Sequence, residues 1–286
     1  MNGALLGDVA EHLDPEPPVE VTDDPLLPGT PDDLGGEPPG GPRLGHDVVG
    51  DLVGAGHQLV GVSSYSNDVP CAKHLPVVGD FASVDAEKIL RLHPDYVLAI
   101  ASQAHMTQEV RALHLRVGFI DDLTYDDLFS SIRRLGVLTG RSDAAAALVA
   151  RLRLQTAALQ RQTQSFKRHP SVFVVLGVQP VFTVGSNSYI ATLISLAGGR
   201  NAVGPLSGGY SAYGDEALLR LQPDVIVADP SVDLQAFLDR EPWRSLKAVR
   251  AKRVWTLPDA AMLERPGPRY NEGVRWLVNH LKPIAS

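Results

Sequence analysis

The sequence of 286 residues has little of several features that define common protein classes. It contains one cysteine, Cys71, which excludes an internal disulfide and a cysteine-based zinc site. No apolar run approaches the ~18 residues that a membrane-spanning helix needs. The nine histidines form no H-x-H or H-x₃-H pair, so we expect no protein-held metal. The sequence also shows no nucleophile elbow, no phosphate-binding glycine loop and no acid–base–nucleophile set, which argues against an enzyme and gives no catalytic residues.

The net charge of −7 is concentrated in one segment. Residues 1–45 hold ten acidic residues and one basic residue, and the remaining residues together carry +2. Without a basic surplus we expect no nucleic-acid partner. The same 45 residues hold nine of the 22 prolines and eight of the 26 glycines, which predicts a disordered or atypical Pro/Gly-rich acidic segment. No basic stretch followed by an apolar stretch is visible in it, so no secretory signal is predicted there.

One pattern occurs in both halves of the chain. Residues 79–95 read GDFASVDAEKILRLHPD and residues 208–224 read GGYSAYGDEALLRLQPD. Each copy places an aromatic residue two positions after a glycine and a glutamate six positions after the aromatic: Phe81 with Glu87, and Tyr210 with Glu216. The spacing is too wide for a solenoid, whose units recur every ~20–50 residues. The repeat therefore predicts two similar lobes, with a ligand cleft between them.

The elements expected around the repeat alternate between helix and strand, which is typical of an α/β fold. We expect an N-terminal lobe over residues 46–124, with a helix at 107–117 and the strands YVLAI and VGFI. Residues 125–166 predict linking helices, because they are rich in Ala, Leu, Arg and Gln. Gly140 can close the first linking helix and Ser142 can cap the second. Residues 167–286 predict a C-terminal lobe, in which SVFVVLG, VFTVG, VIVAD and RVWTL read as strands.

With these segments in this order, the chain resembles the class III periplasmic binding proteins of ABC importers, which serve cobalamin, haem and ferric siderophores. Among them the vitamin B12 binding proteins are the most similar. The resemblance covers roughly residues 50–285 and rests on the repeat and on GAGHQLVGVSSYSNDVP (53–70), LPVVGDF (75–81), SIRRLGVLTGR (131–141), GSNSYIATLISLAGGRN (185–201) and LERPGPRYNEG (263–273). The Pro/Gly-rich segment stands where the family has its first strand. Either the chain does not start at its natural position or the first lobe lacks that strand.

The resemblance implies two Rossmann-like lobes joined by a long backbone α-helix, in an extracytoplasmic or periplasmic monomer. Its ligand would contact residues on the inter-lobe loops: Tyr65, Phe81, Tyr210, Arg265 and Arg269. For the aromatics the alternative is a place in the core, and for the two arginines an ion pair with Glu264 or Glu272. Glu87 and Glu216 would dock to a dimeric permease coupled to its ATPase, although a carboxylate at a helix start is also stabilised by the helix dipole.

The predicted function is a substrate-binding subunit that captures cobalamin or a related corrinoid. No cofactor is expected, since the metal-containing macrocycle or chelate is the ligand itself. A haem or ferric-siderophore binding protein is the alternative within the family, although a siderophore receptor would show more basic residues. A non-transport sensor and an enzyme are the two alternative hypotheses outside the family's transport function. Similarity of fold does not by itself identify the ligand.

Overall fold

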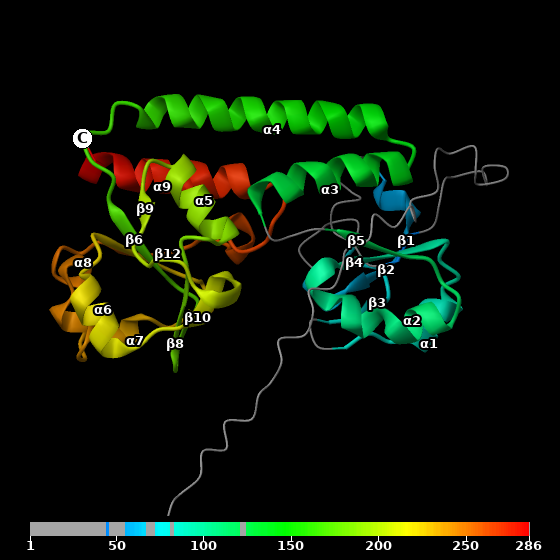
Figure 1. The fold of residues 1–286 in the computed structure, drawn as a ribbon, viewed down its shortest axis with the longest axis horizontal. Coiled ribbons are helices and arrows are strands. Elements are labelled where there is room, and N and C mark those ends of the chain that lie inside the picture. The colour runs from blue at the N-terminus through cyan, green and yellow to red at the C-terminus, as the bar shows by residue number, and fades with distance from the viewer. Residues whose placement is uncertain (1–43, 46–54, 67–71, 81–82, 121–123, 286) are drawn as a thin grey trace, which may run out of the picture.

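The computed structural model of the chain describes residues 44–45, 55–66, 72–80, 83–120 and 124–285. Two α/β lobes lie side by side, and a long helix, α4 (Ser142–Thr163), runs along one side of the molecule (Figure 1). This arrangement confirms the predicted fold class of two lobes joined by a backbone helix. Within the described part of the chain, no helix combines the length and the apolar character needed to cross a membrane.

The N-terminal lobe is built on a parallel sheet with the strand order β3-β2-β1-β4-β5. Its strands are β1 (Leu44–Gly45), β2 (Leu59–Ser63), β3 (Val77–Gly79), β4 (Tyr96–Ile100) and β5 (Val117–Ile120). Strand β1 pairs with β2 on one side and β4 on the other. The first lobe therefore has a strand at the expected place and begins no later than Leu44, two residues before the predicted boundary. Pairing on both sides holds a two-residue strand that the local composition does not favour.

The helix expected at residues 107–117 is much shorter in the structure. A 3-10 turn (Ala101–Thr107) leads into α2 (Gln108–Ala112). His114 then takes a positive φ of 61°, and its N–H bonds to the Arg111 carbonyl at 2.9 Å. This left-handed residue ends the helix and turns the chain into β5, so the prediction of a longer helix was wrong.

Two helices lead from the first lobe to the second. Helix α3 (Tyr125–Leu138) starts at a capping box, in which the Thr124 hydroxyl accepts from the Asp127 N–H and the Asp127 carboxylate accepts from the Thr124 N–H. Gly140 follows its end with a φ of +66°, as expected for a C-terminal glycine. Ser142 is already the first helical residue of α4 and not its cap. At 1.5 Å per residue the 22 residues of α4 extend about 33 Å.

The C-terminal lobe contains two sheets. The parallel sheet has the order β12-β11-β6-β9, with β6 (Ser171–Val175), β9 (Arg200–Asn201), β11 (Val225–Ala228) and β12 (Val254–Thr256). An antiparallel sheet, β10-β8-β7, contains β7 (Gly177–Val178), β8 (Val181–Val184) and β10 (Tyr210–Ala212). The helices of the C-terminal lobe are α5 (Tyr189–Leu196), α6 (Asp215–Leu221), α7 (Gln235–Leu238), α8 (Lys247–Arg250) and α9 (Tyr270–Ala285). VFTVG is thus a strand, as predicted, but it belongs to the antiparallel sheet.

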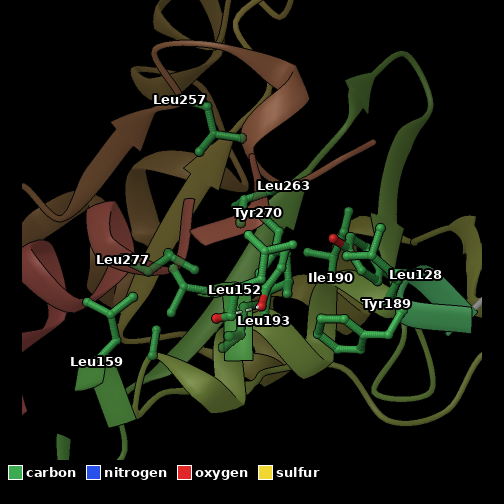
Figure 2. Packing of buried hydrophobic residues seen from close by; sticks show 14 of the residues in the cluster. Leu128, Leu152, Leu159, Tyr189, Ile190, Leu193, Leu257, Leu263, Tyr270 and Leu277 are labelled. Carbon is green, nitrogen blue, oxygen red and sulfur yellow. Dashed lines mark hydrogen bonds between the residues drawn. The ribbon is translucent and has the colours of Figure 1, made fainter. Parts of the chain in front are cut away.

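The linking helices and the C-terminal lobe share one apolar core, part of which Figure 2 shows around Leu152 and Tyr270. Within this core the starts of α3 and α9 meet the middle of α4. The Thr156 hydroxyl lies 2.7 Å from the Tyr270 hydroxyl and 2.8 Å from Asn271 Oδ1, and the Tyr125 and Tyr270 hydroxyls lie 3.1 Å apart. The Tyr125 and Tyr270 rings pack edge to face at 5.3 Å. We call these four residues the helix junction.

Candidate functional site

The sequence repeat forms the same unit in both lobes: a short helix, a tight turn and a buried parallel strand. The unit is α1 (Ala86–Arg91) with β4 in the first lobe and α6 with β11 in the second. Between helix and strand, His93 and Gln222 have positive φ values of 49° and 44°, which is uncommon for residues other than glycine. In α1 the Asp85 side chain caps the helix by accepting from the Lys88 N–H at 2.8 Å. The repeat therefore places equivalent residues at equivalent positions in the two lobes.

Glu87 and Glu216 are the clearest such pair. Each is the second residue of its helix, and their side chains are 89% and 92% exposed. Each lies 3.7 Å from the arginine four residues later, Arg91 or Arg220. Exposed pairs of this kind contribute only about 0.2–0.5 kcal/mol, so the fold does not depend on them. Helices α1 and α6 lie on the side of the lobes away from α4 (Figure 1).

Tyr210 lies on β10, and not in a loop as expected, on the antiparallel sheet that lies towards the first lobe (Figure 1). It pairs directly with Val184, while Phe182 pairs with Ala212, so Tyr210 and Phe182 occupy diagonal positions on one face of the sheet. Both are exposed, at 37% and 39%. Sequence reasoning missed Phe182. The only sequence signal for Phe182 was an aromatic residue in a short predicted strand. Even in the structure, exposure along β8 does not alternate regularly.

The segment GSNS (185–188) positions the approach to Tyr210. The Gly185 N–H bonds to the Gly209 carbonyl at 2.8 Å. The Asn187 side chain donates to the Leu206 carbonyl at 2.9 Å and accepts from the Leu206 N–H at 3.0 Å. A Cβ at Gly185 would lie 2.6 Å from the Leu206 nitrogen, so only glycine fits there. The turn before α5 thus fixes the loop that leads into β10 and Tyr210.

The loop before α9 carries the two predicted arginines. Arg269 donates to Asp259 at 2.7 Å and to Glu272 at 3.0 Å. The ion-pair alternative therefore describes Arg269, with Asp259 as a partner that the sequence did not suggest. Arg265 is exposed, and its charge acts on the nearby carboxyls of Asp259 and Glu264, whose pKa values it lowers as a minor contribution.

A pair of carboxyl groups lies beside this loop, and no sequence pattern predicted it because 34 residues lie between the partners. Asp229 directly follows β11 and is 6% exposed, and its side chain accepts hydrogen bonds from the N–H and the hydroxyl of Ser231. Burial, and then the hydrogen bond to Asp229, raise the pKa of Glu264 to about 8. Burial also raises the pKa of Asp229, but the hydrogen bonds from Glu264 and Ser231 outweigh it and leave that pKa below its ordinary value. At neutral pH Glu264 is therefore protonated and donates to Asp229.

Two of the predicted contact residues have no described side chain. Tyr65 belongs to a 3-10 turn (Ser64–Ser66) directly after β2, but its side chain lies outside the described residues, as does the whole of Phe81. Both roles stay predictions. Among the described residues, no group of three or more His, Cys, Asp or Glu side chains could hold a metal ion.

Two lobes on parallel sheets, spanned by a helix and carrying exposed aromatics on a facing sheet, define a two-lobed binding protein of the helical-backbone class. The family model for periplasmic binding proteins matches residues 45–261. The chain belongs to the periplasmic binding protein family, whose members are transport components rather than enzymes.

Individual relatives agree with this assignment. The chain is 27% identical over 239 residues to the ABC transporter substrate-binding lipoprotein YvrC of Bacillus subtilis, covering 81% of this chain and 75% of the relative. The solved periplasmic vitamin B12 binding protein BtuF of Vibrio cholerae is similar with a TM-score of 0.73 and 26% identity, over 85% of this chain and 96% of that one. The periplasmic haem-binding protein BhuT, solved with two haems, has a TM-score of 0.76 and 25% identity over 85% and 98%. This chain is therefore the substrate-binding component of an importer of the B12, haem and siderophore type.

Proposed function

We propose that this chain captures cobalamin or a related corrinoid outside the cytoplasm and delivers it to a membrane permease with its ATPase. The observation that carries the proposal is the pair of exposed aromatics, Phe182 and Tyr210, on one face of the antiparallel sheet. This sheet lies on the side of its lobe towards the first lobe (Figure 1). Exposed rings in such a position suit an extended, largely apolar macrocycle. Phe81 and Tyr65 would supply contacts from the first lobe.

The charges around the loop before α9 favour a ligand with a neutral rim. Arg269 already donates to Asp259 and Glu272, so it offers little to an anionic ligand. Asp229 adds a further carboxylate beside the loop of Arg265, whereas its partner Glu264 is protonated at neutral pH. A haem carries two propionates and many siderophores are anionic, whereas the rim of a corrinoid carries mainly neutral amides. The negative charge around this loop would therefore weaken the binding of haem or of an anionic siderophore more than the binding of a corrinoid.

Glu87 and Glu216 are the proposed docking residues. Their side chains are almost fully exposed, one on each lobe, and each helix presents its glutamate at the same position. A dimeric permease offers two equivalent basic sites, so one rigid chain could engage both, and the two contacts would reinforce each other. A monomeric binding protein satisfies this geometry.

Titration of the full chain with cyanocobalamin, hemin and a ferric siderophore, by isothermal calorimetry, tests the ligand. We expect cyanocobalamin to bind tightest, and Phe182→Ala and Tyr210→Ala to weaken it. Leu154→Ala is the matched control, because Leu154 is a 71% exposed apolar residue on the long backbone helix. Tighter binding of hemin would favour the haem alternative. Binding of none of the three would favour a sensor that uses the fold for another purpose.

A further inference from the structure

The core contains two buried tyrosines whose hydroxyl groups differ sharply. Tyr270 is fully buried, and its hydroxyl lies 2.7 Å from the Thr156 hydroxyl and 3.1 Å from the Tyr125 hydroxyl. Tyr189, the first residue of α5, is 2% exposed. Its hydroxyl is buried and, among the described residues, has no hydrogen-bond partner. Figure 2 shows both tyrosines in the same apolar cluster.

An isolated buried hydroxyl lowers stability, because it gives up water and gains no partner. The other buried unpartnered atoms in the described chain belong to side chains whose second polar atom is engaged: Gln58, Asn201 and Glu264. Tyr189 has no second polar atom. A phenylalanine would fill the same space without this loss of stability. We therefore expect the hydroxyl to find a hydrogen-bond partner in a state of the protein other than the ligand-free one.

The position of Tyr189 suggests that this partner is the ligand. The turn before it holds the loop that leads to Tyr210, through the hydrogen bond from the Gly185 N–H to the Gly209 carbonyl. Burial raises the pKa of Tyr189 first, and the hydroxyls of Tyr270, Tyr125 and Tyr210 raise it further, while the Gly267 backbone lowers it. The Gly267 N–H is thus close, without the alignment of a hydrogen bond. The backbone geometry agrees, because a Cβ at Gly209, the residue before Tyr210, would lie 3.5 Å from the Cβ of Ser188, the residue before Tyr189.

We propose that the Tyr189 hydroxyl donates a hydrogen bond to an oxygen of the bound ligand, an amide carbonyl or a carboxylate, once the ligand displaces the Tyr210 side chain. This inference rests on the proposed function, because it assumes that the ligand contacts Tyr210. It makes Tyr189 a binding residue that is covered in the ligand-free protein. Tyr210 is 37% exposed, so its ring is the side chain that a ligand meets first.

The test compares the full-length parent with Tyr189→Phe and Tyr270→Phe, measuring Tm without ligand and Kd for cyanocobalamin and hemin. Tyr189→Phe should raise Tm by about 2–4 °C, the shift for one relieved unfavourable group in a protein of this size. It should also raise Kd for the probe that binds by about 3- to 10-fold, the range of one neutral hydrogen bond. Tyr270→Phe loses a satisfied hydroxyl, so it should lower Tm and leave Kd unchanged.

The outcomes separate this inference from the proposed function. If the parent binds and Tyr210→Ala weakens binding while Tyr189→Phe has the parental Kd for both probes, the inference is wrong and the proposed function stands. A lower Tm in Tyr189→Phe would mean that the hydroxyl is already paired, and would also overturn it. If the parent binds neither probe, the proposed function fails and takes the inference with it.

Discussion

The carboxyl pair of Asp229 and Glu264 should make the stability of this protein fall as pH rises through the neutral range. The ordinary pKa of the Glu264 carboxyl is 4.5, and burial followed by the contact with Asp229 raises it to about 8 in the folded protein. Between these values the folded state keeps a proton that the unfolded state has released. The free energy of unfolding therefore decreases as pH rises across this window, and it stays low above pH 8, where both states have released the proton. Below pH 4.5 both states hold the proton, so the full stability is retained.

The size of the effect follows from the shift and from the surroundings of the group. A full one-proton difference changes stability by about 1.4 kcal/mol per pH unit. Because Glu264 is only half-buried, water screens the pair, and we expect roughly a third to a half of that slope. Between pH 5 and 8 this amounts to about 1–2 kcal/mol, or about 2–8 °C in Tm. The lowered pKa of Asp229, from an ordinary value of 3.8, acts only below this window.

Thermal unfolding at pH 5, 6, 7 and 8 measures the effect. Glu264→Gln keeps the shape of the side chain and a donor towards Asp229 but cannot titrate, so its Tm should depend less on pH than the parental Tm. Glu109→Gln, an exposed carboxyl in the other lobe, is the control for removing a charge. Apart from the substituted side chain the three proteins are identical, so only the difference between the curves matters. Parallel curves for the parent and Glu264→Gln would refute the reasoning.

Three further predictions test the site and the core. Phe182→Ala and Tyr210→Ala should each lose about 1–3 kcal/mol of cyanocobalamin binding by calorimetry, since each removes a large apolar contact; parental affinity in both would contradict the aromatic site. Glu87→Arg with Glu216→Arg should abolish ATP-driven uptake into reconstituted vesicles while ligand affinity and Tm stay parental, because both side chains are exposed. Normal uptake by the double variant would exclude docking. Thr156→Val should lower the free energy of unfolding in urea by about 1–3 kcal/mol, whereas Thr156→Ser should not; equal stabilities would show that the junction hydroxyl is dispensable.

The sequence predicted what local patterns determine. The repeat could be recognised because both copies keep glycine, an aromatic residue and glutamate at the same short spacing. The long backbone helix was predicted from composition, since its residues are strong helix formers. The exposure of Glu87 and Glu216 agrees with their place at the helix starts.

Features that depend on distant pairing could not be read in this way. Strand β1 has two residues, and its neighbours in the sheet supply the hydrogen bonds that its own composition does not predict. The antiparallel sheet brings Phe182 next to Tyr210 through a pairing across 26 or more residues. The carboxyl pair of Asp229 and Glu264 is likewise formed only by the fold. In each case tertiary contact, and not local preference, decides the outcome.

The helix junction constrains how this protein can capture a ligand. Hydrogen bonds among the hydroxyls of Tyr125, Thr156 and Tyr270 hold the starts of α3 and α9 to the middle of α4. Thr156 and Tyr270 are buried and Tyr125 is half-buried. Bending there would break hydrogen bonds inside an apolar core, which is more costly than turning a loop hinge. Large closure is therefore disfavoured, and adaptation to a ligand must come from exposed side chains at the facing surfaces. Tyr210 is such a side chain, and the unpartnered hydroxyl of Tyr189 lies near it. If the ligand contacts Tyr189 as proposed, such a rigid frame binds it by local rearrangement of the Tyr210 side chain, without movement of the lobes.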